Sequence, residues 1–334
     1  MFKNIKNLLI NLIVLVGYIK YFNQFFFDKK NNFSIIYLHR VVIKKGLIPE
    51  IEITKDSLIK NIIFLKKRTK LISLNELVSL KKKTGLNKQY SILTFDDGYK
   101  DNLKILFPII QRFKVPVTIY LTTRFLQGDT WMWWYQISEY LRTSDSSDFI
   151  FQEKKYSFIH NDYHKKKFFF DKIKNLLDPL SLVDQKKLCE IITKKQPRKY
   201  DSLCLNWDDV AFLNKSEFIS IGCHSHSHLN LKLLKESKLD YEVNYSKELL
   251  EKKLKKKINH FAFPYGSKAE VGFKTIKKVF DSGFKTAVTT EIFDYNYKKN
   301  FLLNRFSIDS DTTLGRLNIK IFGLENSLKK YINS

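Results

Sequence analysis

Short apolar runs alternate with longer amphipathic stretches along most of this 334-residue chain. The runs are rich in β-branched and aromatic residues, which is typical of strands buried on both faces. The stretches between them repeat apolar residues at helical spacing, as Leu58, Ile62 and Leu65 do within residues 54–68. The runs with the strand pattern are 33–40, 71–74, 91–95, 115–121, 218–223, 259–263, 284–290 and 302–308. Their alternation with helices predicts a parallel α/β fold, which we expect to be a barrel of about seven strands.

The alternation is interrupted by residues from about 125 to 200. This segment contains Trp131, Trp133 and Trp134, and continues with helical stretches rich in Lys and Leu. We therefore expect a helical insertion that covers one end of the barrel. The tryptophans have two interpretations: they line a sugar-binding cleft, where their faces stack on carbohydrate, or they anchor the insertion to the core.

An apolar segment occupies residues 1–30 and precedes the predicted barrel of residues 31–334. Its longest apolar stretch, residues 8–19, is short for a membrane span, and no small-residue cleavage site follows it. The segment is an uncleaved signal anchor, an interfacial helix with basic flanks, or an apolar helix packed on the domain. We expect membrane association through this segment. The side of the membrane stays open, and the cytoplasmic side is among the options.

The formal net charge of +25 comes largely from lysines scattered along the chain. No nucleic-acid-binding motif accompanies the charge, so we expect no nucleic-acid partner. A compositional bias explains most of this charge. The functional alternative is that the lysines attract the protein to an anionic membrane surface. The three cysteines are too few and too scattered for a disulfide framework, and their odd number favours a reducing compartment.

The residues that could bind a metal or transfer protons lie where the apolar runs end. The run 91–95 stops at Asp96, Asp97 and Gly98. An Asp-Gly pair after a strand is ordinary turn chemistry, but two adjacent carboxylates at the end of a buried strand repel each other. A metal ion resolves the repulsion, because one carboxylate can bind the metal while the other stays free as a base.

Histidines supply the second part of this pattern. The run 218–223 is followed by His224, His226 and His228, three of the seven histidines in the chain. The spacing of His224 and His228 predicts that both imidazoles lie on one side of a helical turn and reach one cation. One Asp with two His leaves coordination positions open for water and substrate, as a catalytic site requires.

Two further segments also end at the same side of the predicted barrel. His39 lies at the end of the run of residues 33–40, and Pro264 and Tyr265 follow the run of residues 259–263. The carboxyl ends of barrel strands are where functional groups converge. The sequence therefore predicts that all of these side chains meet at one rim.

These motifs resemble the polysaccharide deacetylase family, carbohydrate esterase family four. Its first motif, T-F-D-D-G, is present at residues 94–98, and its second resembles the His-Ser-His-Ser-His run at 224–228. The resemblance implies a distorted (β/α) barrel, with Asp96 as the catalytic base and Asp97, His224 and His228 as ligands of a divalent metal, most simply Zn²⁺. It also implies a hydrolase that removes N-acetyl or other acyl groups from a sugar of an envelope polysaccharide or glycolipid precursor.

The sequence departs from the commonest family pattern in two places. The third motif usually contains an Arg, but residues 261–266 read Phe-Ala-Phe-Pro-Tyr-Gly, and no His follows His260. Tyr-Leu-His-Arg-Val at 37–41 resembles an element of a rearranged branch, so we expect His39 to replace the missing acid and Arg305 to orient Asp96. The Tyr265 N–H would stabilise the oxyanion. Two alternatives stay open: an amide hydrolase for a small non-carbohydrate substrate, and a non-catalytic metal-binding protein that binds glycans.

Overall fold

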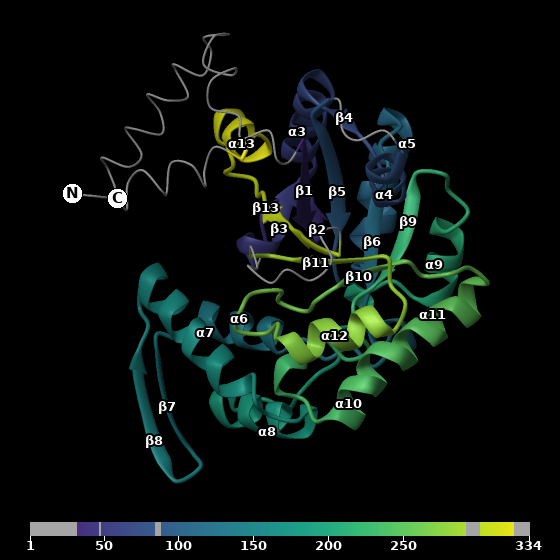
Figure 1. The fold of residues 1–334 in the computed structure, drawn as a ribbon. Helices are drawn as coiled ribbons and strands as arrows, with labels where there is room; N and C mark the ends of the chain where they lie inside the picture. The colour runs from purple at the N-terminus through teal and green to yellow at the C-terminus, as the bar shows by residue number, and fades with distance from the viewer. Residues whose placement is uncertain (1–31, 47, 84–87, 292–300, 324–334) are drawn as a thin grey trace, which may run out of the picture.

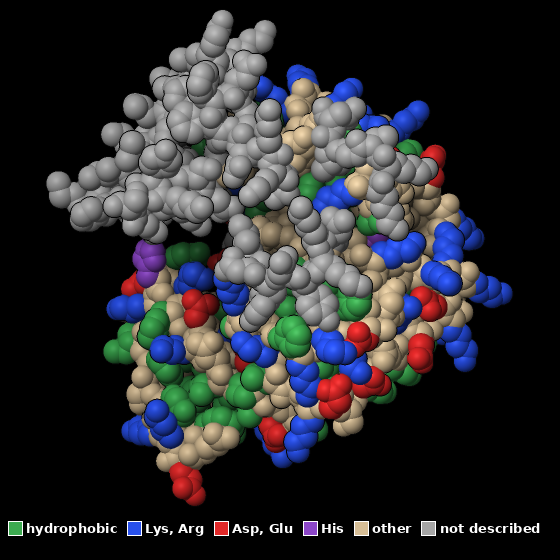
Figure 2. Space-filling view, viewed as in Figure 1, with side chains coloured by type: hydrophobic (Ala, Val, Ile, Leu, Met, Phe, Trp, Pro, Cys, Tyr) green, Lys and Arg blue, Asp and Glu red, His purple; other side chains and the backbone are tan. Residues whose placement is uncertain are grey.

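A computed structural model describes residues 32–46, 48–83, 88–291 and 301–323. The predicted apolar segment 1–30 lies outside these residues, so the expected N-terminal helix is not part of the described fold. Within the described ranges, no helix is both long and apolar enough to cross a bilayer. On the face shown in Figure 2, Lys and Arg side chains are spread over the surface and alternate with acidic side chains.

A parallel sheet forms the centre of the molecule (Figure 1). Its strand order is β12-β11-β10-β9-β6-β5-β1-β13, and β4 pairs with β5 beside this path. Every pairing in this sheet is parallel, as the alternation of strands and helices predicts. The strands are β1 (Phe33–Leu38), β4 (Lys70–Leu71), β5 (Tyr90–Phe95), β6 (Val117–Leu121), β9 (Ile219–Cys223), β10 (His260–Ala262), β11 (Thr286–Thr289), β12 (Leu302–Asn304) and β13 (Phe306–Ser307).

The sheet is nearly closed because its two edge strands are consecutive in the sequence. Strand β12 pairs with β11, β13 pairs with β1, and only Arg305 separates β12 from β13. The apolar run 302–308, expected as one strand, is therefore divided at Arg305 between the two edges of the barrel. This division gives eight strands along the path where about seven were expected.

Helices cover the outside of this barrel (Figure 1). The predicted helix 54–68 is present as Lys55–Arg68. Leu93 and Ile119 of the strands share one apolar core with Ile62 and Leu250 of the helices. The helices are α3 (Lys55–Arg68), α4 (Leu74–Lys83), η2 (Asn102–Leu106, a π turn) with α5 (Phe107–Phe113), α9 (Trp207–Leu213), α10 (Glu236–Asp240), η6 (Tyr241–Tyr245, a π turn), α11 (Ser246–Leu254), α12 (Phe273–Asp281) and α13 (Leu314–Ile321).

The segment expected as a helical insertion also contains a β-hairpin. Its elements are α6 (Trp133–Thr143), β7 (Ser146–Phe151), β8 (Lys154–Ile159), α7 (Tyr163–Leu177) and α8 (Leu182–Thr193). Phe149 stacks on Tyr156 across the antiparallel pair, with ring centroids 5.1 Å apart. The turn residues Gln152 and Glu153 both have positive φ, although neither is a usual turn residue. The hairpin therefore lacked a turn signal in the sequence.

Short elements complete the description. Strands β2 (Arg40–Val42) and β3 (Glu52–Thr54) form a small parallel pair, and single 3₁₀ turns are η1 (Pro49–Ile51), η3 (Phe125–Gln127), η4 (Asp201–Leu203) and η5 (Leu231–Leu233). The insertion has its own apolar core, which includes Trp131, Trp133 and Phe169.

Candidate active site

The carboxyl ends of the barrel strands share one rim, and the predicted polar residues meet there. One cavity of about 490 Å³ is lined by side chains from this rim and from the insertion. The predicted residues in its lining are His39 after β1, Asp96 and Asp97 after β5, His224 and His228 after β9, and Tyr265 after β10. Trp133, Trp134 and Phe170 of the insertion also line this cavity. The insertion therefore closes over the barrel end that carries the polar residues.

Asp97, His224 and His228 form a group that could hold a metal ion, with ligand atoms within 4.8 Å of one another. The Asp97 Oδ1 atom lies 3.4 Å from the Nε2 atom of each imidazole. It is buried and has no hydrogen-bond partner among the described residues. The His224 Nδ1 atom lies 2.8 Å from the carbonyl oxygen of Ala262, which can only accept. This contact assigns a proton to Nδ1 and leaves Nε2 as the ring nitrogen that faces Asp97 and could bind a metal.

The ionisation states of Asp97 and His228 fit the same use, whereas burial would lower the pKa of His224 but Asp97 and Asp96 raise it, so metal binding there displaces a proton. Burial would raise the pKa of Asp97, but the imidazoles of His228 and His224 hold it well below its ordinary value. Burial lowers the pKa of His228 to about 4, against the opposing charge of Asp97. A carboxylate and a neutral imidazole are the forms of these side chains that bind metal. The donor set therefore fits a divalent cation of the zinc type.

The prediction that His224 and His228 lie on a helical turn is wrong. Residues 224–228 form an irregular loop in which Ser225 and His228 have the left-handed φ values of 62° and 56°. The two rings nevertheless meet, with centroids 5.0 Å apart. The reversal of the chain within the loop, not the helical period, brings the imidazoles together.

Glu242, which the sequence did not single out, holds this loop. It lies on the π turn η6 and is fully buried. Its Oε2 atom accepts the backbone N–H groups of His226 at 3.1 Å and Ser227 at 2.7 Å. An acidic residue next to the apolar Val243, on the side of a helix that packs against the barrel, was the available signal, because a buried carboxylate needs donors.

His226 does not join the metal group. Its Nδ1 atom is 2.8 Å from the Thr123 Oγ1 atom, and its ring packs edge-on against Tyr241 and Tyr245. Burial lowers its pKa to about 4, so it is neutral at neutral pH. His226 is a structural residue of the loop.

Asp96 is bound by Arg305 through two parallel hydrogen bonds. The Arg305 Nη1 and Nη2 atoms lie 2.7 Å and 2.8 Å from the two carboxylate oxygens, and Nη1 also donates to Thr94 Oγ1 at 3.1 Å. Both side chains of the ion pair are buried. Burial would raise the pKa of Asp96, but Arg305 holds it below its ordinary value. The guanidinium that the third motif lacks therefore reaches Asp96 from the junction of β12 and β13.

His39 is half-buried and lines the cavity. Its ring packs edge-on against Tyr37, and Asn102 donates to its backbone carbonyl at 3.0 Å. Its position leaves the imidazole accessible to a molecule in the cavity, as a proton donor needs.

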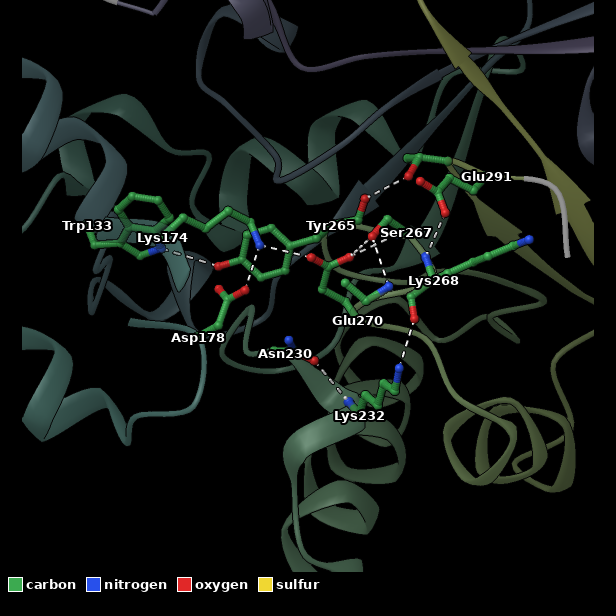
Figure 3. Close-up of polar contacts among 12 residues, drawn as sticks. Trp133, Lys174, Asp178, Asn230, Lys232, Tyr265, Ser267, Lys268, Glu270 and Glu291 are labelled. Atoms are coloured by element: carbon green, nitrogen blue, oxygen red, sulfur yellow. Dashed lines mark hydrogen bonds and ion pairs between the residues drawn. The ribbon is translucent and has the colours of Figure 1, made fainter. Parts of the chain in front are cut away.

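Tyr265 lies in a tight turn with a left-handed φ of 62° (Figure 3). Its carbonyl accepts from Thr290 Oγ1 at 3.0 Å, and its hydroxyl accepts from Trp133 Nε1 at 3.3 Å. Its own N–H donates no hydrogen bond within the part of the chain that the structure describes. Pro264 is buried beside it and does not line the cavity.

The tryptophans anchor the insertion, and two of them also line the cavity. Trp133 and Trp134 belong to the core of the insertion and also line the cavity. The Trp134 ring lies 5.2 Å from the His228 ring, and the Trp133 ring lies 5.1 Å from Phe170. An aromatic wall thus begins directly at the metal group.

Comparison with protein families matches residues 83–279 to the family described as polysaccharide deacetylase. No curated protein sequence matches the chain. The match spans more than half of the chain and includes Asp96, Asp97 and the histidine loop.

Solved structures share the fold. The deacetylase PplD of Streptococcus pyogenes in complex with acetate aligns with a TM-score of 0.59 and 14% identity, over 86% of this chain and 97% of that chain. A de-N-acetylase of Aggregatibacter actinomycetemcomitans aligns with a TM-score of 0.56 and 15% identity, over 86% and 98% of the two chains. IcaB of Ammonifex degensii aligns with a TM-score of 0.56 and 14% identity, over 87% and 97%. At these identities the likeness concerns the fold.

Proposed function

The chain belongs to the polysaccharide deacetylase family, hydrolases of carbon–nitrogen bonds other than peptide bonds, and from this premise we propose a metal-dependent reaction and its residues. The proposed reaction removes an N-acetyl or other acyl group from a sugar of an envelope polysaccharide or glycolipid precursor. The observation that carries the metal dependence is the Asp97 Oδ1 atom, buried without a hydrogen-bond partner among the described residues and 3.4 Å from each of two imidazole nitrogens.

Asp97, His224 and His228 would hold the cation, and Zn²⁺ suits one carboxylate with two imidazoles. A divalent metal there supplies Lewis acidity toward the acyl carbonyl and makes a water more acidic. Three protein ligands would leave coordination positions for water and substrate.

The remaining residues take the proton-transfer and binding roles. Asp96 accepts the proton of the attacking water, and Arg305 keeps its carboxylate ionised and oriented. The Tyr265 N–H donates to the oxyanion that develops on the acyl oxygen. His39 protonates the leaving amine from its half-exposed position in the cavity.

The walls of the cavity favour a sugar over a small non-carbohydrate amide. Trp133, Trp134 and Phe170 present aromatic rings beside the metal group, and aromatic faces stack on the apolar faces of sugar rings. The non-catalytic alternative rested on the missing Arg of the third motif, and Arg305 supplies that guanidinium.

Membrane association through residues 1–30 is a separate proposal. It is supported by the apolar composition of that segment and by the net charge of +25. Co-sedimentation with anionic vesicles by the full chain, and its loss in a chain without residues 1–30, is the expected result. Equal sedimentation of both chains would contradict it.

The test of the function is acetate release from an N-acetylated oligosaccharide by the purified protein with added Zn²⁺. Asp96→Asn is expected to bind metal normally and to lose turnover by a factor of about 10²–10⁴, because the general base is gone. Asp97→Ala is expected to lose the metal itself. If the wild type released no acetate, the proposed reaction would be refuted. If Asp96→Asn turned over as fast as the wild type, the role of Asp96 as the base would be refuted.

A further inference from the structure

Lys174 connects the insertion to the turn that follows β10 (Figure 3). It lies on α7, and its Nζ atom contacts Asp178 Oδ2 at 2.6 Å and Glu270 Oε1 at 2.9 Å. The same ammonium lies 4.6 Å from the centroid of the Tyr265 ring. One cation therefore bridges a carboxylate of the insertion, a carboxylate of the barrel and the aromatic ring of a candidate active-site residue.

Glu270 links Lys174 to the turn that contains Tyr265. Its Oε2 atom accepts from the backbone N–H of Ser267 at 3.1 Å and from the Ser267 hydroxyl. Ser267 is two residues beyond Tyr265, and on the other side Thr290 N–H donates to the Gly266 carbonyl at 2.9 Å. The turn is thus held from the barrel by Thr290 and from the insertion by Lys174 through Glu270.

The ammonium is engaged mainly within the protein. Two of its three N–H donors bind carboxylates, and the face of the Tyr265 ring lies against it. Burial alone would lower the pKa of Lys174, but hydrogen bonds to Asp178 and Glu270 outweigh burial and raise it. Lys174 consequently stays charged and engaged with its protein partners although it lines the cavity.

We propose that Lys174 is a positioning residue of the deacetylase: it holds the Tyr265 turn against the insertion and so sets where the Tyr265 N–H meets the developing oxyanion. This inference rests on the proposed function and deepens it. A left-handed residue such as Tyr265 keeps its conformation only when its surroundings impose it, and the Lys174 contacts are part of those surroundings. The insertion would therefore act on catalysis as well as on substrate binding.

Lys174→Met tests the proposal because it removes the charge and keeps a long side chain. We expect kcat on an N-acetylated oligosaccharide to fall between about tenfold and a hundredfold, because a displaced oxyanion donor weakens transition-state binding. KM should change less than about threefold, because substrate contacts persist. Zn²⁺ stoichiometry should equal that of the wild type.

Two companion variants separate positioning from folding. Lys174→Arg retains a cation for both carboxylates and should recover most of kcat. Lys172→Met is the matched control, since Lys172 is an exposed lysine of the same helix that lies over the Phe168 ring at 5.2 Å and does not line the cavity. If Lys174→Met does not fold, Glu270→Gln weakens the same bridge from the barrel side and should show a smaller loss of kcat.

The outcomes are distinct. A higher KM with unchanged kcat would make Lys174 a substrate ligand, and wild-type kinetics in Lys174→Met or no recovery in Lys174→Arg would also overturn the proposal. If the wild type releases acetate and the Lys174 variants give one of these results, the proposed function still holds and only the role of Lys174 is refuted. A wild type without acetate release would refute the function, and with it this role of Lys174.

Discussion

Arg305→Met is the substitution whose effect the structure defines most closely. Arg305 is 1% exposed, and its guanidinium is the cation that neutralises the buried Asp96. Removing one partner of a buried ion pair leaves an uncompensated charge and costs about 3–5 kcal/mol. We expect the free energy of unfolding to fall by that amount near neutral pH, although Met fills much of the volume.

The pH dependence follows from the pKa of Asp96. In the wild type Arg305 holds this pKa below its ordinary value, so the pair stabilises the fold above about pH 4 and loses that contribution as pH falls through the lowered pKa. In Arg305→Met, burial is opposed only by His224 and His39, so we expect the pKa of Asp96 to rise above its unfolded value. The contribution of Asp96 is then favourable at low pH and is lost as pH rises through the raised pKa. The stability gap between the two proteins should therefore widen from pH 5 to pH 8.

Urea unfolding of both proteins in chelator, at pH 5 and pH 8, measures this gap without interference from metal. Arg316→Met is the matched control, because Arg316 is exposed on α13 and its loss should change stability by less than about 0.5 kcal/mol. Adding Asp96→Asn to Arg305→Met removes the unpaired charge and should restore at least about 2 kcal/mol. A gap that is the same at both pH values, or no recovery in the double variant, would refute the assignment of Arg305 as the partner of a charged Asp96.

Two further predictions concern the histidine loop and the proton donor. Glu242→Ala leaves the buried N–H groups of His226 and Ser227 unpaired, so Zn²⁺ affinity measured by competition titration should fall about 10–100-fold. Glu242→Gln keeps an acceptor and should lose less affinity. If Glu242→Ala bound Zn²⁺ as tightly as the wild type, Glu242 would have no role in holding the loop. His39→Gln should lower kcat about 10²–10⁴-fold while Zn²⁺ stoichiometry stays that of the wild type, and a wild-type kcat in this variant would show that another group protonates the amine.

The local part of the site was predictable because it depends on strand ends. Asp97 follows one apolar run and His224 follows another, and parallel strands bring their carboxyl ends to one rim whatever the details of packing. The same logic placed His39 and Tyr265 in the cavity. The loop conformation at His228 was mispredicted, because a spacing of four suits a helical turn and an irregular loop equally well.

The sequence by itself determined the alternation of strands and helices, the parallel barrel and the Asp97–His224–His228 group, since each follows from patterns a few residues long. Only the tertiary structure decided how the barrel closes around Arg305, which reaches Asp96 across 209 positions of sequence. It also decided that Glu242 holds the histidine loop and that Lys174 of the insertion meets Glu270 of the barrel. These contacts depend on strand register and on how separate elements pack together. A charge that this packing buries is tolerated only where a group of opposite charge lies beside it.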